Sequence, residues 1–231
     1  QTKEMNKIGV MQGRRLLPQS ERIQSFPFDD WEREFKIAAK LGLECIEWIY
    51  DANDEQINPI ETEEGRQHLV AAQQETSVLV ESICADLFMH ENLIGKNGEP
   101  DEVNVAKLLD LAEWAQELRI KHIVLPFVDS STLGSPQEVE GLFQLFERIN
   151  PYVEGEIIEF HLETDFAAAE LMKIWEEINR NYVWLNYDSG NSASLGFDIK
   201  EDLPILGKAI KSIHLKDRVV GGGTVPLGEG D

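Results

Sequence analysis

The chain has 231 residues, of which 42% are hydrophobic and 28% charged, a size and composition that suit one large α/β domain or two small ones. The formal net charge of −22 repels phosphate backbones, so non-specific nucleic-acid binding is not expected. No stretch approaches the roughly 20 apolar residues that span a bilayer, and the polar N-terminus lacks the apolar region of an export signal. We therefore expect a cytoplasmic protein without a membrane segment, in which Cys45 and Cys84 are reduced core residues.

Short apolar runs and helical stretches alternate along the whole chain. The runs predict strands at 7–11, 43–49, 77–85, 121–128, 156–163, 182–188 and 209–216. Helical periodicity lies between them at 29–42, 61–75, 101–118, 135–149, 165–179 and 197–210, and Asp165 is expected to cap the fifth helix. Strands separated by single helices pair in parallel through right-handed crossovers. No linker or low-complexity segment interrupts the pattern, so residues 1–231 are expected to form one domain.

Two architectures fit this alternation, a doubly wound open sheet and a (β/α)8 barrel. The first predicted strand leads into GVMQGRRLLP, which contains neither GxGxxG nor the Walker phosphate-binding pattern. The absence of a glycine-rich phosphate loop at this point favours the barrel.

Three consecutive predicted strands end in side chains that can bind a metal. Glu163 ends the fifth strand, Asp188 the sixth and His214 the seventh, with steps of 25 and 26 residues. One βα repeat separates each pair, so the three should meet at the carboxyl ends of neighbouring strands, where both architectures place function. Together they are good ligands for Mn²⁺, Mg²⁺, Co²⁺ or Zn²⁺. Each of them alone could equally be a solvated or paired residue, and it is the regular spacing that favours a metal site.

Alternation along the fifth strand supports this orientation. Residues 158, 160 and 162 are apolar and would pack against helices, whereas Glu159, His161 and Glu163 would point into the barrel. A polar inner face is unusual for a purely structural parallel strand. We expect His161 to support the site rather than to bind the metal.

Several stretches resemble one family: GVMQGRRLLP, AAKLGLECIEWIYD, HLETD, NYDSGNSASLG and IHLKDRVVGGGTVPLGEGD. Together they resemble the sugar-phosphate isomerases and epimerases of the xylose isomerase-like TIM-barrel superfamily, along nearly the whole chain. The resemblance implies a metal held by Glu, Asp, His and a further Glu from strands five to eight, and Glu163, Asp188 and His214 match the first three. The fourth ligand would lie beyond Asp231, so we expect a TIM (β/α)8-type barrel whose eighth strand is missing from this chain.

The resemblance also implies a reaction, the movement of a proton next to a carbonyl in a sugar or sugar phosphate through an enediolate. A divalent metal would polarise the substrate oxygens, and Glu163 could bind the ion and serve as the base. Return of the proton to the adjacent carbon gives aldose–ketose isomerisation. A second carboxylate on the opposite face would give epimerisation.

Further polar residues are candidate substrate contacts. Glu47 ends the second predicted strand, and Arg14 follows the first, where it could meet a phosphate or a hydroxyl. Lys216 shares the inward side of the seventh strand, and Arg218 resembles an anion-binding residue of related epimerases. Glu47 could instead form a buried ion pair, and Arg14 could instead lie at the surface.

Asn191 stands three residues after Asp188, where the endonuclease branch and some epimerases carry His. An amide can hydrogen-bond a substrate hydroxyl but is a poor metal ligand. This difference and the net charge of −22 argue against an abasic-site endonuclease relative. A divergent, non-catalytic barrel that binds a sugar remains the other alternative. We expect a small-molecule sugar or sugar phosphate as partner, and a homo-oligomer stays open.

Overall fold

The structure, a computed structural model, describes residues 7–13, 25–51 and 56–230. Its main feature is a seven-stranded parallel sheet whose strands follow one another in chain order. The strands are β1 (Gly9–Met11), β2 (Cys45–Ile49), β3 (Leu79–Cys84), β4 (His122–Phe127), β5 (Glu159–Thr164), β6 (Val183–Asp188) and β7 (Ile210–His214).

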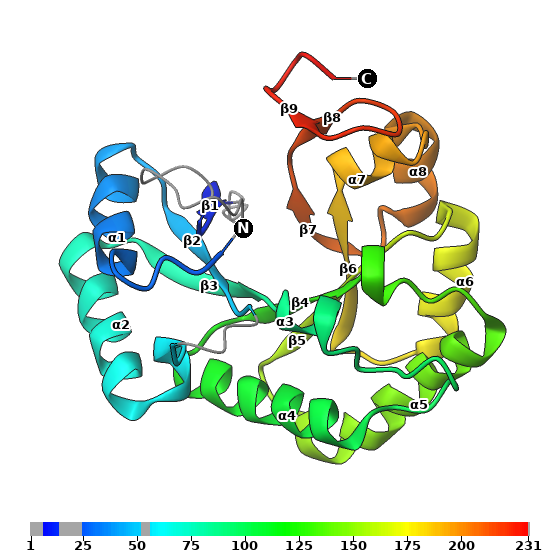
Figure 1. Ribbon diagram of the computed structural model, residues 1–231, viewed down its shortest axis with the longest axis horizontal. Helices are drawn as coiled ribbons and strands as arrows, with labels where there is room; N and C mark the ends of the chain where they lie inside the picture. Colours follow the sequence, from blue (N-terminus) through cyan, green and yellow to red (C-terminus); the bar gives the residue numbers. More distant parts are fainter. Residues whose placement is uncertain (1–6, 14–24, 52–55, 231) are drawn as a thin grey trace, which may run out of the picture.

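Helices follow the strands and lie on the outer side of the curled sheet (Figure 1). The long ones are α1 (Trp31–Lys40), α2 (Glu63–Thr76), α4 (Glu102–Glu117), α5 (Pro136–Val153), α6 (Ala168–Ile178) and α8 (Ile199–Leu206). Shorter elements are η1 (Pro59–Glu61), α3 (Leu87–His90), η2 (Asp129–Ser131), α7 (Ser189–Ser194) and the antiparallel hairpin of β8 (Asp217–Arg218) and β9 (Thr224–Val225).

The predicted fold class is confirmed, an α/β TIM-type barrel in which one strand is missing. Each predicted strand and helix has its counterpart within a few residues of the expected bounds. In the described ranges no eighth parallel strand follows β7, so β1 and β7 are the edges of the sheet. Both cysteines are free thiols, with Cys84 buried and Cys45 half-buried.

The outer face of the sheet and the helices form the apolar core. On β5, Phe160 and Leu162 are both 0% exposed, as the alternation predicts. Phe160 packs near Phe146 of α5, with ring centroids 6.3 Å apart. At the edge of the sheet, β7 pairs only with β6 in the described part of the chain, and its Ile213 is 58% exposed.

The expectation that Asp165 caps a helix is wrong. Helix α6 begins at Ala168, and its N-cap residue is Ala167. The carboxylate of Asp165 instead accepts a hydrogen bond from the hydroxyl of Thr132, in the loop after η2. The chain leaves β5 through a short loop before it can turn into the helix, and Asp165 is bound within that loop.

None of the described helices is both long and apolar enough to cross a bilayer.

A stacked pair of imidazoles inside the sheet predicts how stability depends on pH. The rings of His122 and His161 are parallel, with centroids 3.9 Å apart. Burial lowers the pKa of His122 to about 3, and the neighbouring His161 ring adds to the effect. Between about pH 3 and pH 6.5, His122 binds a proton in the unfolded chain but not in the folded chain. The contribution of His122 to stability is therefore present above about pH 6.5 and is lost as the pH falls.

We expect His122→Gln to remove part of this pH dependence. The free energy of unfolding, measured by urea denaturation, should fall between pH 6.5 and pH 4 by on the order of 3 kcal/mol less in His122→Gln than in the wild type. Carboxylates that titrate in the same range affect both proteins alike. Parallel curves for the two proteins would show that His122 does not carry the effect.

Candidate metal and substrate site

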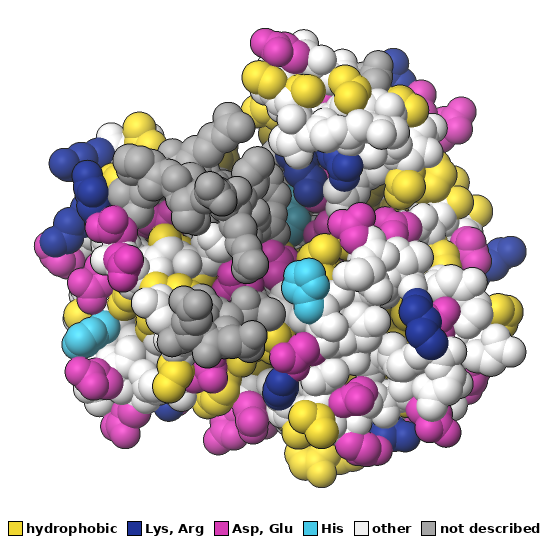
Figure 2. Space-filling model, viewed as in Figure 1, with side chains coloured by type: hydrophobic (Ala, Val, Ile, Leu, Met, Phe, Trp, Pro, Cys, Tyr) yellow, Lys and Arg dark blue, Asp and Glu magenta, His cyan; other side chains and the backbone are white. Residues whose placement is uncertain are grey.

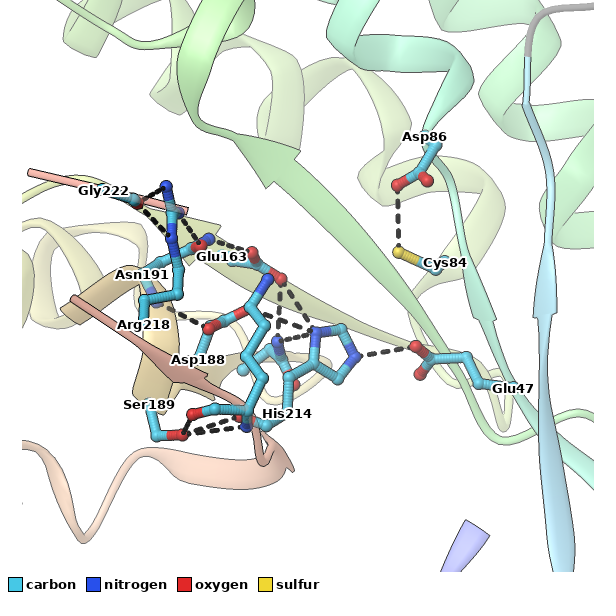
Figure 3. Close-up of polar contacts among 12 residues, drawn as sticks. Glu47, Cys84, Asp86, Glu163, Asp188, Ser189, Asn191, His214, Arg218 and Gly222 are labelled. Carbon is cyan, nitrogen blue, oxygen red and sulfur yellow. Dashed lines mark hydrogen bonds and ion pairs between the residues drawn. The ribbon is translucent and has the colours of Figure 1, made fainter. Parts of the chain in front are cut away.

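Glu163, Asp188 and His214 come together at the carboxyl ends of β5, β6 and β7. We call these three residues the metal triad. One ligand atom from each lies within 4.8 Å of the others, and no second group of this kind is found in the described residues. Glu163 is 7% exposed and Asp188 5%, and His214 is half-buried. Figure 3 shows the three side chains converging from neighbouring strands.

Strand register creates this meeting point. Asp188 and His214 are direct partners across the β6–β7 pair. A register shift between Leu185 and Asn186 makes them so, because Leu185 pairs with Ile210 whereas Asn186 pairs with Ser212. Without that shift, Asp188 would face the residue before His214.

The imidazole of His214 lies between acidic side chains. Its Nε2 is 2.7 Å from Oε1 of Glu47, and its Nδ1 is 3.1 Å from Oε2 of Glu163 and 3.8 Å from Oδ2 of Asp188. Burial alone would lower the pKa of His214, but Glu47 and Glu163 raise it well above its ordinary value. Burial likewise opposes ionisation of Glu47, yet His214 holds its pKa at about 2. A carboxylate bound to the far nitrogen is the usual arrangement that orients a metal-binding imidazole.

The two carboxylate oxygens of Asp188 have different partners. Its Oδ1 accepts the backbone N–H of Asn191 at 2.8 Å and thereby caps α7. Its Oδ2 is buried and forms an ion pair with Nζ of Lys216 at 2.6 Å. The other metal-binding atoms within 4.8 Å of Asp188 are a carboxylate oxygen of Glu163 and a ring nitrogen of His214. The donor set fits a divalent cation.

Two amides hold the carboxylate of Glu163. Nδ2 of Asn191 donates to Oε1 at 2.7 Å, and Nδ2 of Asn186 donates to Oε2 at 3.0 Å. Each oxygen therefore has its own donor, which sets the plane of the carboxylate.

Arg218 brings a cation to the same place from the β8–β9 hairpin. Its guanidinium donates to the carbonyl of Gly222 through Nε and Nη2, and to Oδ1 of Asn191 through Nη1. It forms no ion pair with any residue of the described ranges. Three of its five N–H groups are accounted for, so two remain for another oxygen ligand.

Gly190 makes room for the two cationic side chains. A Cβ atom there would lie 2.6 Å from Cγ of Lys216 and 3.1 Å from Cγ of Arg218. Any other residue would push at least one of these side chains aside. In Figure 2, Asp and Glu side chains gather near the middle of this view, with Lys and Arg side chains beside them, below the β8–β9 hairpin of Figure 1.

The structure thus brings together every predicted site residue that it describes. Arg14 lies outside the described residues. The predicted roles of the others stay predictions, and the structure adds contacts that sequence reasoning missed. The most important is Asn186, which lies two positions before Asp188 and shares its face of β6 by alternation.

A family model described as a xylose isomerase-like TIM barrel matches residues 35–231. The chain belongs to this family. The expected resemblance is thereby confirmed. Among curated proteins no match was found.

Solved structures of low sequence identity share the fold. A xylose isomerase domain protein from Planctomyces limnophilus superposes with a TM-score of 0.71 at 20% identity, over 97% of this chain and 82% of that chain. A xylose isomerase-like TIM-barrel protein from Mycobacterium smegmatis, in complex with magnesium, gives 0.70 at 15% identity, over 97% and 82%. An L-ribulose 3-epimerase gives a TM-score of 0.70 at 13% identity, over 98% of this chain and 74% of that chain.

The metal triad predicts a direct binding result. We expect metal-free protein to bind Mn²⁺, and His214→Ala to weaken that binding by about tenfold or more, because it removes a nitrogen donor. Isothermal titration calorimetry measures both affinities. His68→Ala is a matched control, since His68 is an exposed histidine on α2 whose side chain is 57% accessible. Equal Mn²⁺ affinities for His214→Ala and the wild type would exclude His214 as a ligand.

Proposed function

We propose that this protein is a divalent-metal-dependent isomerase or epimerase that moves a proton next to a carbonyl in a sugar or sugar phosphate. The observation that carries the proposal is the convergence of the metal triad, within 4.8 Å, at the carboxyl ends of three parallel strands. Membership of the xylose isomerase-like family supports it, as does the similar fold of an L-ribulose 3-epimerase.

In this proposal, Glu163, Asp188 and Nδ1 of His214 hold the metal ion. The ion would be Mn²⁺, Mg²⁺, Co²⁺ or Zn²⁺, and magnesium accompanies one protein of the same fold. When bound, it polarises the carbonyl and the neighbouring hydroxyl of the substrate. Glu47 holds Nε2 of His214 and so leaves Nδ1 directed toward Glu163 and Asp188.

Glu163 is the proposed base. Asn191 and Asn186 fix one oxygen each, so the carboxylate has little freedom to rotate away from the substrate. It removes the proton from the carbon beside the carbonyl, and the substrate becomes an enediolate. Delivery of this proton to the adjacent carbon completes an isomerisation, whereas delivery from another group to the opposite face of the same carbon inverts it.

Lys216, Arg218 and Asn191 are the proposed substrate contacts. Arg218 has spare N–H donors and no acidic partner in the described ranges, which suits a phosphate or another oxyanion of the substrate. Lys216 lies on the same side, beside Gly190. Arg14, which lies outside the described residues, is proposed as a further substrate contact on the basis of the sequence alone. A contact between Glu47 and the substrate also stays a prediction. Oε1 of Glu47 already binds His214.

Proton exchange with solvent tests the reaction across a panel of candidate sugars. Ketoses, aldoses and their phosphates are incubated with the Mn²⁺-loaded protein in D₂O, and NMR detects deuterium next to the carbonyl. We expect exchange with at least one compound and a loss of about 100-fold or more in kcat for Glu163→Gln, because an amide cannot accept the proton. Glu170→Gln, an exposed change at the start of α6, should retain the rate.

Binding of a sugar without any exchange would contradict the proposed reaction and favour a non-catalytic, sugar-binding barrel. Exchange that survives in Glu163→Gln would assign the base to another residue.

Arg218 predicts a difference between phosphorylated and neutral substrates. We expect Arg218→Gln to raise KM for a sugar phosphate by about tenfold or more, since a charged hydrogen bond contributes about 1.5–3 kcal/mol. KM for the corresponding unphosphorylated sugar should change much less. Arg218→Lys keeps the charge but loses the planar fork, and an intermediate KM is expected. Equal effects on both sugars would show that Arg218 does not select for the phosphate.

A further inference from the structure

A second polar layer lies directly beneath the metal triad. Its members each stand two positions before a triad residue on the same strand: His161, Asn186 and Ser212. Alternation therefore places them on the same inner face of the sheet. Asn186 and Ser212 are direct partners across β6 and β7. His161 is 1% exposed and Asn186 5%, whereas Ser212, on the edge strand β7, is half-buried.

Short hydrogen bonds join the three side chains. Nδ1 of His161 lies 2.7 Å from Oγ of Ser212, and Oγ of Ser212 lies 2.7 Å from Oδ1 of Asn186. The amide of Asn186 then reaches the metal triad, with Nδ2 at 3.0 Å from Oε2 of Glu163 and 3.1 Å from Nδ1 of His214. The layer therefore contacts two of the three proposed ligands.

The chemistry of the groups decides the direction of these bonds. An ionised carboxylate only accepts, so the nitrogen of the Asn186 amide must face Glu163. Its oxygen then faces Ser212, whose single hydroxyl proton is used to donate to it. Oγ of Ser212 can only accept from the other side, so the 2.7 Å contact requires a proton on Nδ1 of His161. Nε2 of the same ring lies farther from its own acceptor, at 3.3 Å from Oε2 of Glu159.

This series of hydrogen bonds, from His161 through Ser212 to Asn186, cannot conduct protons to Glu163. The amide of Asn186 neither gains nor loses a proton under ordinary conditions, so it interrupts any transfer from His161 to Glu163. What it can transmit is position. Because Oδ1 of Asn186 is held by Ser212, its amide cannot flip, and Nδ2 stays between Glu163 and His214. Buried polar networks in which every group has a partner are rigid in this way.

We propose that His161, Ser212 and Asn186 form a directed positioning chain that holds the carboxylate of Glu163 beside His214, at the spacing needed for a metal ion. The three residues are positioning residues, since only Asn186 touches a ligand and none would touch substrate. The proposal rests on the proposed metal site and does not depend on which sugar is the substrate.

Ser212 is the best residue to test, because it touches no member of the metal triad through its hydroxyl in the contacts described. Ser212→Ala releases the amide of Asn186, and Ser212→Thr keeps a hydroxyl. Asn186→Leu removes the amide but preserves the approximate volume. Tyr187→Phe is the matched control, since it deletes a buried hydroxyl from the opposite face of β6 that bonds to Ser192 and Asp202.

Mn²⁺ affinity, measured by calorimetry with the metal alone, is the first readout. We expect losses of about tenfold or more for Asn186→Leu and about threefold or more for Ser212→Ala, as for other residues that support metal ligands. Ser212→Thr should recover most of the affinity, and Tyr187→Phe should retain it. The visible spectrum of the Co²⁺-loaded protein should change in Ser212→Ala, because the ligands move. A purely structural role for Ser212 would lower the melting temperature without altering either quantity.

Nitrogen-15 NMR of the imidazoles, in the metal-free protein, is the second readout. We expect Nδ1 of His161 to carry a proton in the wild type. An unprotonated Nδ1 of His161 would overturn the proposed direction of the hydrogen bonds. Unchanged Mn²⁺ affinity in both Ser212→Ala and Asn186→Leu would overturn the positioning role. If His214→Ala leaves Mn²⁺ affinity intact, the proposed metal site itself fails and the positioning role fails with it. If metal binding is lost only in His214→Ala, the metal site is supported, and only the positioning role of His161, Ser212 and Asn186 is refuted.

Discussion

The site depends on the close approach of three carboxylates around a single imidazole. Glu47, Glu163 and Asp188 all lie near His214, in surroundings where like charges repel far more strongly than in water. Such a cluster persists only if cations compensate it. The imidazolium of His214 and the ammonium of Lys216 do so in this structure, and a divalent ion would do so more fully.

The elements around the cluster hold its cations and amides in place. Asp188 is at once the last residue of β6 and the N-cap of α7, so the strand end fixes the helix that carries Asn191. Behind α7, hydrogen bonds of 2.9 to 3.0 Å join Tyr187 and Ser192 to Asp202 of α8. The β8–β9 hairpin then packs over α7 and brings Arg218 to Asn191.

Charge is distributed unevenly over the molecule. A net charge of −22 would repel an anionic substrate, yet Lys216 and Arg218 lie side by side next to the metal triad. Their side chains fit together only because residue 190 has no Cβ atom. The local potential at a site can therefore have the opposite sign to the overall charge. The net charge disfavours binding of a nucleic acid, but it does not disfavour a small phosphate bound beside Lys216 and Arg218.

By itself, the sequence determined the order of strands and helices and the membership of the metal triad. Both follow from local periodicity and from the βα repeat, which brings Glu163, Asp188 and His214 to successive strand ends. The tertiary structure decided which atoms meet. The contact of Glu47 with His214 spans 167 positions, and the pairing of Asp188 with His214 depends on a register shift that leaves no signal in the sequence. The prediction that Asp165 caps a helix was wrong for a similar reason, because its partner Thr132 comes from a loop that is distant in the sequence. Alternation tells which face a side chain occupies, but only the curvature and register of the assembled sheet bring distant faces together.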